Sequence, residues 1–182
     1  GFRELWGHAI FQCPYCHGWE VQDQRWGYLG SARDAGHLLP FAMMAKGWTR
    51  DLVVFTGGEI EVPDEARARF DAVGIKLETA PVARLLGEGK RLEAVELAGG
   101  REVPLDVLFT HPPQRHVDIV RSLGVALDDH GYVEVDPMMR ETSVPGVYAA
   151  GDLTTRMQGA VFAAAAGTQA AAAINGVLAM EG

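Results

Sequence analysis

Two cysteines three positions apart are the residues whose types and spacing most directly indicate chemistry. Cys13 and Cys16 enclose Pro14 and Tyr15, and the sequence holds no other cysteine. Two thiols at this spacing can close a small disulfide. A thiolate formed at one of them can attack a substrate disulfide, and the second thiol can then resolve the mixed disulfide. The pair therefore predicts dithiol–disulfide exchange, with Cys13 and Cys16 as catalytic residues.

His17 follows the second cysteine directly. Imidazole gains and loses a proton near neutral pH, so His17 can act as acid or base during thiol exchange, or hold a thiolate as an ion pair. We therefore include His17 among the catalytic residues. A histidine that only packs at the rim of the site is the alternative.

Four other interpretations of the cysteine pair compete with redox exchange. A structural zinc site needs four ligands, and one cysteine pair with His8 and His17 nearby does not supply a second cluster. Attachment of c-type haem requires Cys-x-x-Cys-His, which His17 completes, but no export signal is present at the start. A thioredoxin or glutaredoxin fold requires a long helix from the first cysteine, which Gly18 disfavours. Two ordinary buried thiols are the remaining alternative.

A second pattern lies near the C-terminus. Val147–Ala150 is expected to be a strand that runs into Gly151 and Asp152, and a long helix rich in small residues follows. This order can place the Asp152 carboxylate near a ribityl hydroxyl and helix-start N–H groups near the electron-rich pyrimidine edge of a flavin. The predicted cofactor-binding residues in this segment are Gly151, Asp152, Gln158, Gly159, Ala160 and Val161. Plain packing is the alternative.

Strands alternating with helices must position these residues. We expect strands at 26–30, 51–56 and 75–78, with helices at 36–46 and 63–73 between them. This order predicts an α/β fold, a Rossmann-like three-layer nucleotide-binding domain with a parallel sheet.

The pattern changes after residue 90. Residues 91–97, 100–104 and 107–110 are expected to be strands of an antiparallel piece, followed by a short helix at 116–123, an extended segment at 131–135 and a helix at 159–180. Pro112 and Pro113 favour a boundary. We place the redox motif and nucleotide-binding domain in residues 1–113 and the C-terminal part of an FAD-binding domain in residues 114–182.

Composition limits the classes of function. The net charge is −8, which argues against nucleic acid as a partner, because binders of nucleic acid carry basic surfaces that neutralise phosphate. The most apolar stretch, residues 160–173, is short and interrupted by Gly167, Thr168 and Gln169, so no membrane partner is expected.

The whole chain resembles the thioredoxin reductase family of FAD-dependent pyridine nucleotide-disulfide oxidoreductases. Residues 13–20 are similar to its redox motif, and residues 144–152 to its closing FAD motif. The resemblance implies FAD as cofactor, a homodimer and a cytoplasmic setting. It also implies that Cys16 is the thiol nearer the flavin, and that Cys13 exchanges with a thioredoxin-like protein or a small dithiol or disulfide.

The sequence departs from the family pattern in the loops that bind FAD and the nicotinamide dinucleotide. The Gly-rich loop that binds the FAD pyrophosphate is absent, so this chain alone is expected to bind FAD poorly. The nucleotide loop maps Gly-x-Gly-x-x-Ala onto Gly30, Ala32 and Ala35, and Ala32 puts a methyl group where backbone should approach a pyrophosphate.

Asp34 adds negative charge to the same loop, and residues 55–58 offer no arginine for a 2′-phosphate and no acid for a ribose, although Arg33 or Arg50 could substitute. NAD(P)H use is therefore left open. A nicotinamide-independent dithiol oxidase that uses oxygen, and a non-catalytic module with vestigial cysteines, are the alternative functions.

Overall fold

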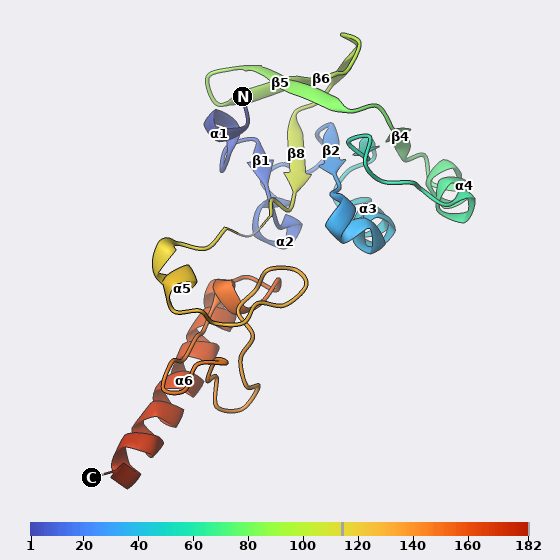
Figure 1. The fold of residues 1–182 in the computed structure, drawn as a ribbon. Coiled ribbons are helices and arrows are strands. Elements are labelled where there is room, and N and C mark those ends of the chain that lie inside the picture. The colour runs from blue at the N-terminus through green and yellow to red at the C-terminus, as the bar shows by residue number, and fades with distance from the viewer. Residues whose placement is uncertain (114, 182) are drawn as a thin grey trace. The chain divides into compact units, whose positions relative to one another are not determined.

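The chain divides into two compact units, Gly1–Pro112 and Pro113–Gly182. The computed structural model describes residues 1–113 and 115–181; the side chains of Arg33 and Asp34, named above for the nucleotide loop, lie outside the described residues. Figure 1 shows the elements of each unit.

A five-stranded parallel sheet forms the centre of the first unit. Its strand order is β1-β8-β2-β3-β4, and every neighbouring pair is parallel. Successive strands β2, β3 and β4 extend the sheet to one side, whereas β8 and β1 lie on the other side of β2. The strands are β1 (Ile10–Phe11), β2 (Trp26–Leu29), β3 (Leu52–Phe55), β4 (Lys76–Glu78) and β8 (Val107–Thr110).

Side chains of these strands alternate between two separate cores, because successive residues of a strand point to opposite faces. Trp26, Val54 and Phe109 belong to a core that includes residues of helices α3 (Leu38–Ala45) and α4 (Asp64–Ala72). On the other face, residues such as Phe55 and Leu108 pack with the antiparallel sheet β5-β6-β7. That sheet comprises β5 (Val82–Glu88), β6 (Arg91–Leu97) and β7 (Glu102–Pro104).

The predicted α/β class and its parallel sheet are therefore confirmed: helices, parallel sheet and antiparallel sheet form three layers. Two details differ from the prediction. Residues 107–110 belong to the parallel sheet rather than to the antiparallel piece, and all four residues are buried. Strands β1 and β5 were not predicted, because β1 has only two residues and β5 alternates weakly between half-buried and exposed positions.

Short helical segments connect these strands. The predicted helix at 36–46 is α3, and a 3₁₀ segment precedes it. The short segments of the first unit are α1 (Phe2–Leu5), α2 (Pro14–His17) and the 3₁₀ helix η1 (Ala32–His37).

The second unit is built on a long helix and irregular segments. Its helices are α5 (Asp118–Ser122), the 3₁₀ turn η2 (Asp152–Thr154) and α6 (Ala160–Glu181). The expected strand at 147–150 is not formed: Tyr148 makes one isolated bridge to Glu141. The extended segment at 131–135 contributes bridges from Val133 and Val135.

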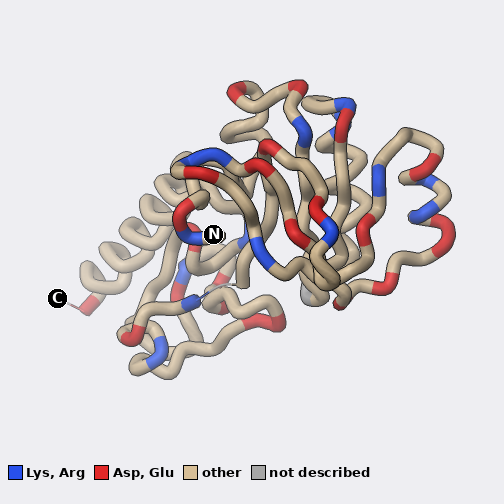
Figure 2. Tube along the Cα trace, turned by 90° about the horizontal axis from the view of Figure 1, so that it is seen from above, with Lys and Arg blue, Asp and Glu red and all other residues tan. Residues whose placement is uncertain are grey.

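Helix α6 runs through the glycine and polar residues that were expected to interrupt it. Its 22 residues include Gly167 and Thr168, and a single glycine costs a helix only about 1 kcal/mol. By length and composition alone α6 could cross a membrane, a criterion that core helices of soluble proteins also meet. Figure 2 shows α6 almost without charged residues; its only one is Glu181.

Candidate functional site

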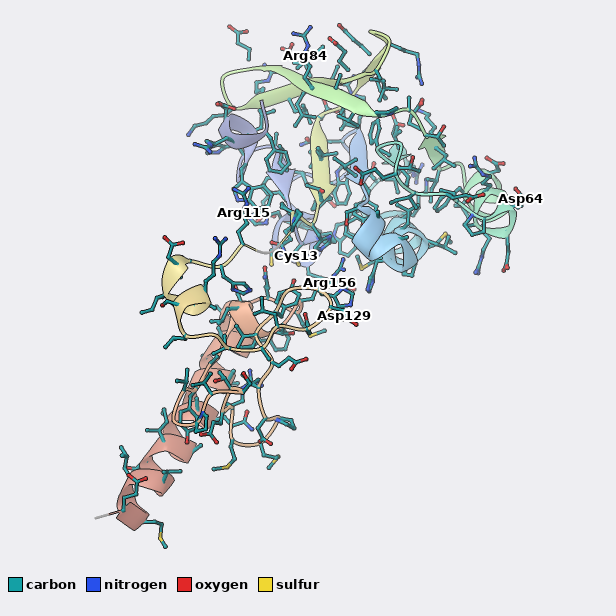
Figure 3. All side chains as sticks on the ribbon, viewed as in Figure 1. Cys13, Asp64, Arg84, Arg115, Asp129 and Arg156 are labelled. Carbon is teal, nitrogen blue, oxygen red and sulfur yellow. The ribbon has the colours of Figure 1, made fainter. Side chains whose placement is uncertain are left out.

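The redox motif lies at the carboxyl end of the parallel sheet. Strand β1 ends at Phe11, two residues before Cys13, and it pairs with β8. Figure 1 shows α2 at the tips of the β1 and β8 arrows, and Figure 3 labels Cys13 there. In open α/β sheets ligands bind outside the carboxyl ends of the strands, where the strand order reverses. Here the order reverses between β2 and β8, next to β1.

Local geometry places both cysteines within a single turn of a short helix. Cys13 is the N-cap residue of α2 in extended conformation, and Pro14 occupies the first helical position, where its fixed φ suits the helix. The backbone N–H of Cys16 donates to the carbonyl of Cys13 over 3.2 Å. Both cysteines are free thiols; Cys13 is half-buried and Cys16 is exposed.

The two thiols interact with each other. A hydrogen bond with the Cys13 side chain raises the pKa of the Cys16 thiol above its ordinary value, and burial and the negative charge of an ionised Cys13 act in the same direction. Ionisation of Cys13 thus opposes ionisation of Cys16. Exchange followed by resolution uses one thiolate at a time.

His17 lies on the surface of α2 and stacks on Phe11. The ring centroids are 4.4 Å apart and the rings are inclined by 17°. The stack fixes the imidazole plane while the residue remains exposed. His17 therefore both packs and keeps access to solvent, so the structure accommodates the acid–base role and the packing role together.

Metal binding receives no support from the described residues. Within residues 1–113 and 115–181, no group of three or more His, Cys, Asp or Glu side chains converges. A structural zinc site needs four such ligands.

The turn after β2 departs from a dinucleotide-binding loop in shape as well as in sequence. Gly30 is required for packing: a Cβ there would lie 2.6 Å from Leu38 Cδ1 and 2.8 Å from Ile60 Cδ1. Ala32 and Ala35 fall in the 3₁₀ helix η1 and are exposed. The turn thus allows strand and helix to approach closely, but a methyl group at Ala32 and a 3₁₀ turn stand where the family pattern places glycine and a helix start.

The loop after β3 is used for packing. Thr56 is buried, and its hydroxyl donates to the carbonyl of Thr79 over 3.3 Å. Gly58 has φ +79°, and a Cβ there would lie 2.7 Å from the ring of Pro81. These residues do not fit the recognition of a ribose or a 2′-phosphate, which requires an acidic or a basic side chain.

In the second unit, Gly151, Asp152 and the start of α6 form the predicted flavin segment. Gly151 has φ +83°, and its backbone passes close to α6, because a Cβ there would lie 3.4 Å from Ala163 Cβ. Asp152 Oδ1 accepts a hydrogen bond from the N–H of Gly159 over 3.3 Å. The Gln158 side chain donates to the Asp152 carbonyl over 3.4 Å. An exposed carboxylate therefore lies beside a helix start.

This segment fits a flavin. The exposed Asp152 carboxylate can accept from a ribityl hydroxyl, and the first-turn amides at Ala160 and Val161 lack carbonyl partners within their own helix. The small residues of α6 let a ring system approach its backbone.

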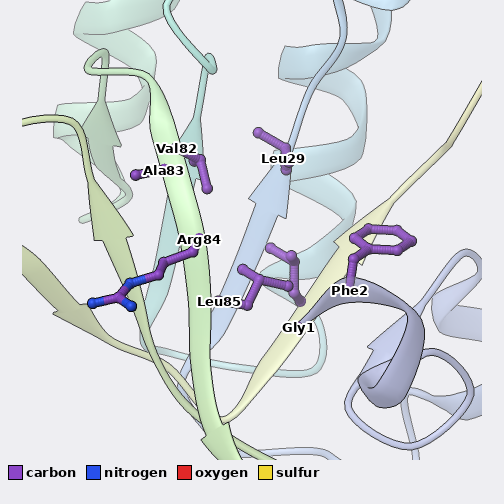
Figure 4. A pocket seen from close by; sticks show the side chains of 8 residues that line it. Gly1, Phe2, Leu29, Val82, Ala83, Arg84 and Leu85 are labelled. Atoms are coloured by element: carbon purple, nitrogen blue, oxygen red, sulfur yellow. The ribbon is translucent and has the colours of Figure 1, made fainter.

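A separate cavity lies on the face of the parallel sheet that β5 covers. It measures about 240 Å³, and Figure 4 shows its mostly aliphatic lining. Arg84 is its charged residue, and the guanidinium is engaged by Glu96 over 2.7 Å. The cavity contains no nucleophile and is not part of the redox site. Its lining residues are Gly1, Phe2, Leu29, Val82, Ala83, Arg84, Leu85 and Leu108.

Several known proteins are similar to this chain in sequence and fold. The family model for pyridine nucleotide-disulphide oxidoreductases matches residues 50–167. The chain belongs to this family. The thioredoxin reductase SirT of Leptosphaeria maculans is 27% identical over 195 residues, which cover 96% of this chain and 57% of that protein.

Solved structures share the fold of this chain. HlmI is 34% identical with a TM-score of 0.80, over 98% of this chain and 55% of HlmI. TrxB of Bacillus anthracis, described as a candidate thioredoxin reductase, is 31% identical with a TM-score of 0.83, over 98% of this chain and 59% of TrxB. This chain thus has the thioredoxin reductase-like fold and spans less than two thirds of the length of these relatives.

Sequence reasoning missed two parts of the site. Strand β1, which attaches the redox motif to the sheet, is too short for a periodic pattern. Trp48, which packs against Gly18 and Tyr15 of the motif, is the second part. A tryptophan thirty residues from a cysteine pair carries no local signal of this contact.

Proposed function

We propose that this chain comprises the redox motif, the nucleotide-binding domain and the C-terminal part of the FAD-binding domain of a thioredoxin reductase-like flavoenzyme. In the intact enzyme, electrons pass between FAD and the Cys13–Cys16 pair. The observation that carries this proposal is the position of Cys13 and Cys16 on one short helix at the carboxyl edge of the parallel sheet, where the Cys16 N–H donates to the Cys13 carbonyl. The family membership of residues 50–167 supports it.

The chemistry assigned to the chain is a two-step exchange. The Cys13 thiolate attacks one sulfur of a substrate disulfide, the substrate S–S bond breaks, and the leaving thiolate takes a proton. The Cys16 sulfur then attacks Cys13, which releases the second substrate thiol and leaves a Cys13–Cys16 disulfide. Two electrons have moved to the substrate. When bound, FAD supplies or accepts the two electrons that interconvert this disulfide and the dithiol.

His17 is proposed to supply and remove protons in these steps. It follows Cys16 directly, and its stack on Phe11 fixes the imidazole plane. Asp152 and the start of α6 are proposed to hold the ribityl chain and the pyrimidine edge of FAD. A thioredoxin-like protein or a small dithiol or disulfide is the proposed substrate, and a cytoplasmic homodimer the proposed assembly.

The test follows flavin bleaching in the FAD-loaded enzyme after addition of excess small dithiol. We expect bleaching in the wild type and its loss in Cys13→Ser and Cys16→Ser, with Met43→Leu, a change on the exposed side of α3, as the matched control. Equal bleaching in all four proteins would refute the role of the pair and favour a non-catalytic module.

One second function is favoured by specific observations. The methyl group of Ala32 and the packed loop at Thr56 and Gly58 do not fit a nicotinamide dinucleotide. A dithiol oxidase would take electrons from substrate thiols and pass them to flavin and then oxygen, without nicotinamide. Rapid bleaching of the flavin by NADPH under anaerobic conditions would exclude this oxidase; bleaching by dithiol alone, with reoxidation by air, would favour it.

A further inference from the structure

The redox helix α2 cannot hold its own geometry. It has four residues, and isolated helices shorter than about 12 residues are marginal in water. Contacts from other elements must therefore fix the relative positions of Cys13 and Cys16.

Trp48 supplies the closest of these contacts. It follows α3, more than thirty residues from the cysteines. Its indole edge lies directly against the end of α2: a Cβ on Gly18 would be 2.8 Å from both Cδ1 and Nε1 of Trp48. The ring of Tyr15, between the two cysteines, meets the Trp48 ring edge-on, with centroids 5.3 Å apart and planes at 87°.

A ring stack and a backbone hydrogen bond hold Trp48 in place. It stacks on Trp26, which is fully buried, with centroids 6.3 Å apart. The Trp48 carbonyl accepts a hydrogen bond from the N–H of Asp23 over 2.9 Å, and Trp26 Nε1 donates to the carbonyl of Val21 over 2.7 Å. The chain that leaves α2 is thus tied to both tryptophans.

A second contact comes from β1, because His17 stacks on Phe11, the last residue of that strand. Phe11 and Trp48, from different parts of the chain, therefore both contact the α2 segment. The rings of Phe11 and Trp26 both pack against the Phe109 ring, with centroid distances of 6.0 and 4.5 Å. Phe11 and the Trp26–Trp48 stack therefore belong to the same hydrophobic core.

We infer that Trp48 is a positioning residue for the redox pair: by packing on Tyr15 and Gly18 it holds Cys13 and Cys16 at disulfide-forming approach and so sets their dithiol–disulfide equilibrium. This role rests on the proposed redox function of the two cysteines. Disulfide closure depends on the effective concentration of one thiol at the other. A support that limits the motion of α2 raises that concentration and favours the disulfide.

The equilibrium can be measured on the 182-residue chain without flavin. One glutathione disulfide oxidises the protein dithiol: the Cys13–Cys16 bond forms, two electrons pass to glutathione, and two glutathione thiols receive the two protons. The fraction of protein disulfide is read by mass after trapping of free thiols, across a series of glutathione ratios. We expect Trp48→Ala to lower the equilibrium constant for oxidation about tenfold, which raises the reduction potential by about 30 mV.

Two further variants separate positioning from general damage. Trp48→Phe keeps an aromatic ring against α2 and is expected to restore most of the wild-type equilibrium. Trp19→Ala removes a tryptophan that is 75% exposed, one residue beyond Gly18, and is expected to leave the equilibrium unchanged. An equilibrium in Trp48→Ala equal to that of the wild type, or an equal shift in Trp19→Ala, would overturn the inference.

If circular dichroism shows that Trp48→Ala does not fold, the same equilibrium is measured in Tyr15→Leu. Its side chain is 76% exposed, so its loss removes the contact with Trp48 without opening a core cavity. A shift in the same direction supports the inference, and an unchanged equilibrium overturns it. The glutathione equilibrium is measured without flavin. It can therefore be interpreted even if the flavin-bleaching experiment on the proposed function fails.

Discussion

Replacement of Gly18 by alanine tests the packing beneath the redox motif. The backbone at Gly18 has φ −62° and ψ −31°, which alanine adopts without strain. On conformational grounds alone, such a substitution stabilises a protein by about 0.4–1 kcal/mol, because it restricts the unfolded chain. The sign of the effect therefore depends on what the new methyl group meets.

The methyl group would meet three atoms inside contact distance. It would lie 2.4 Å from the Pro14 carbonyl oxygen and 2.8 Å from both Cδ1 and Nε1 of Trp48. Overpacking of this kind typically costs about 1–3 kcal/mol. We expect Gly18→Ala to lower the free energy of unfolding of the first unit by roughly 1–2 kcal/mol once the gain in the unfolded state is subtracted.

Tryptophan fluorescence during urea unfolding reports on the first unit selectively. All four tryptophans, Trp6, Trp19, Trp26 and Trp48, lie within residues 1–112. Gly36→Ala is the matched control, because a Cβ at Gly36 would meet nothing within 4 Å. The control is expected to be neutral or slightly stabilising.

A double substitution identifies the source of the cost. Trp48→Ala removes two of the three close contacts, so Gly18→Ala should cost less in that background, with a coupling energy of about 0.5–3 kcal/mol. If Gly18→Ala were as stable as Gly36→Ala, or showed no coupling to Trp48, the proposed contact between the indole and α2 would be refuted.

Two further outcomes concern ionisable groups. Because Cys13 raises the pKa of Cys16 by hydrogen bonding and by its charge, Cys13→Ala should lower that pKa and increase the thiolate fraction. Iodoacetamide should then alkylate Cys16 faster at neutral pH, and an unchanged rate measured by mass spectrometry would contradict the interaction. Arg101 holds the pKa of Glu78 below its ordinary value, so this pair stabilises the fold above about pH 4 and loses its effect as pH falls through the lowered pKa. Glu78→Gln should therefore lower the urea midpoint at pH 7. The decrease should be slight, because the Arg101 side chain is 58% exposed and solvent weakens such an ion pair. In strong acid the variant should match the wild type, and an equal difference at both pH values would count against the ion pair.

Local patterns in the sequence determined much of this protein. The cysteine spacing identifies the redox pair because both sulfurs lie within one turn of chain. The apolar run at residues 52–55 predicts a strand because all four side chains are buried between two cores. Helix α6 follows from composition, since alanine has the highest intrinsic helix propensity and this segment is rich in it.

Tertiary structure decided the rest, because the deciding contacts join residues far apart in the chain. Residues 107–110 have the pattern of any buried strand, and only pairing with β1 and β2 places them in the parallel sheet. The sequence shows Trp48 as one more apolar residue, and folding brings its ring against Tyr15 and Gly18. The raised pKa of Cys16 likewise arises from the approach of two side chains, which the spacing permits and the packing around α2 fixes.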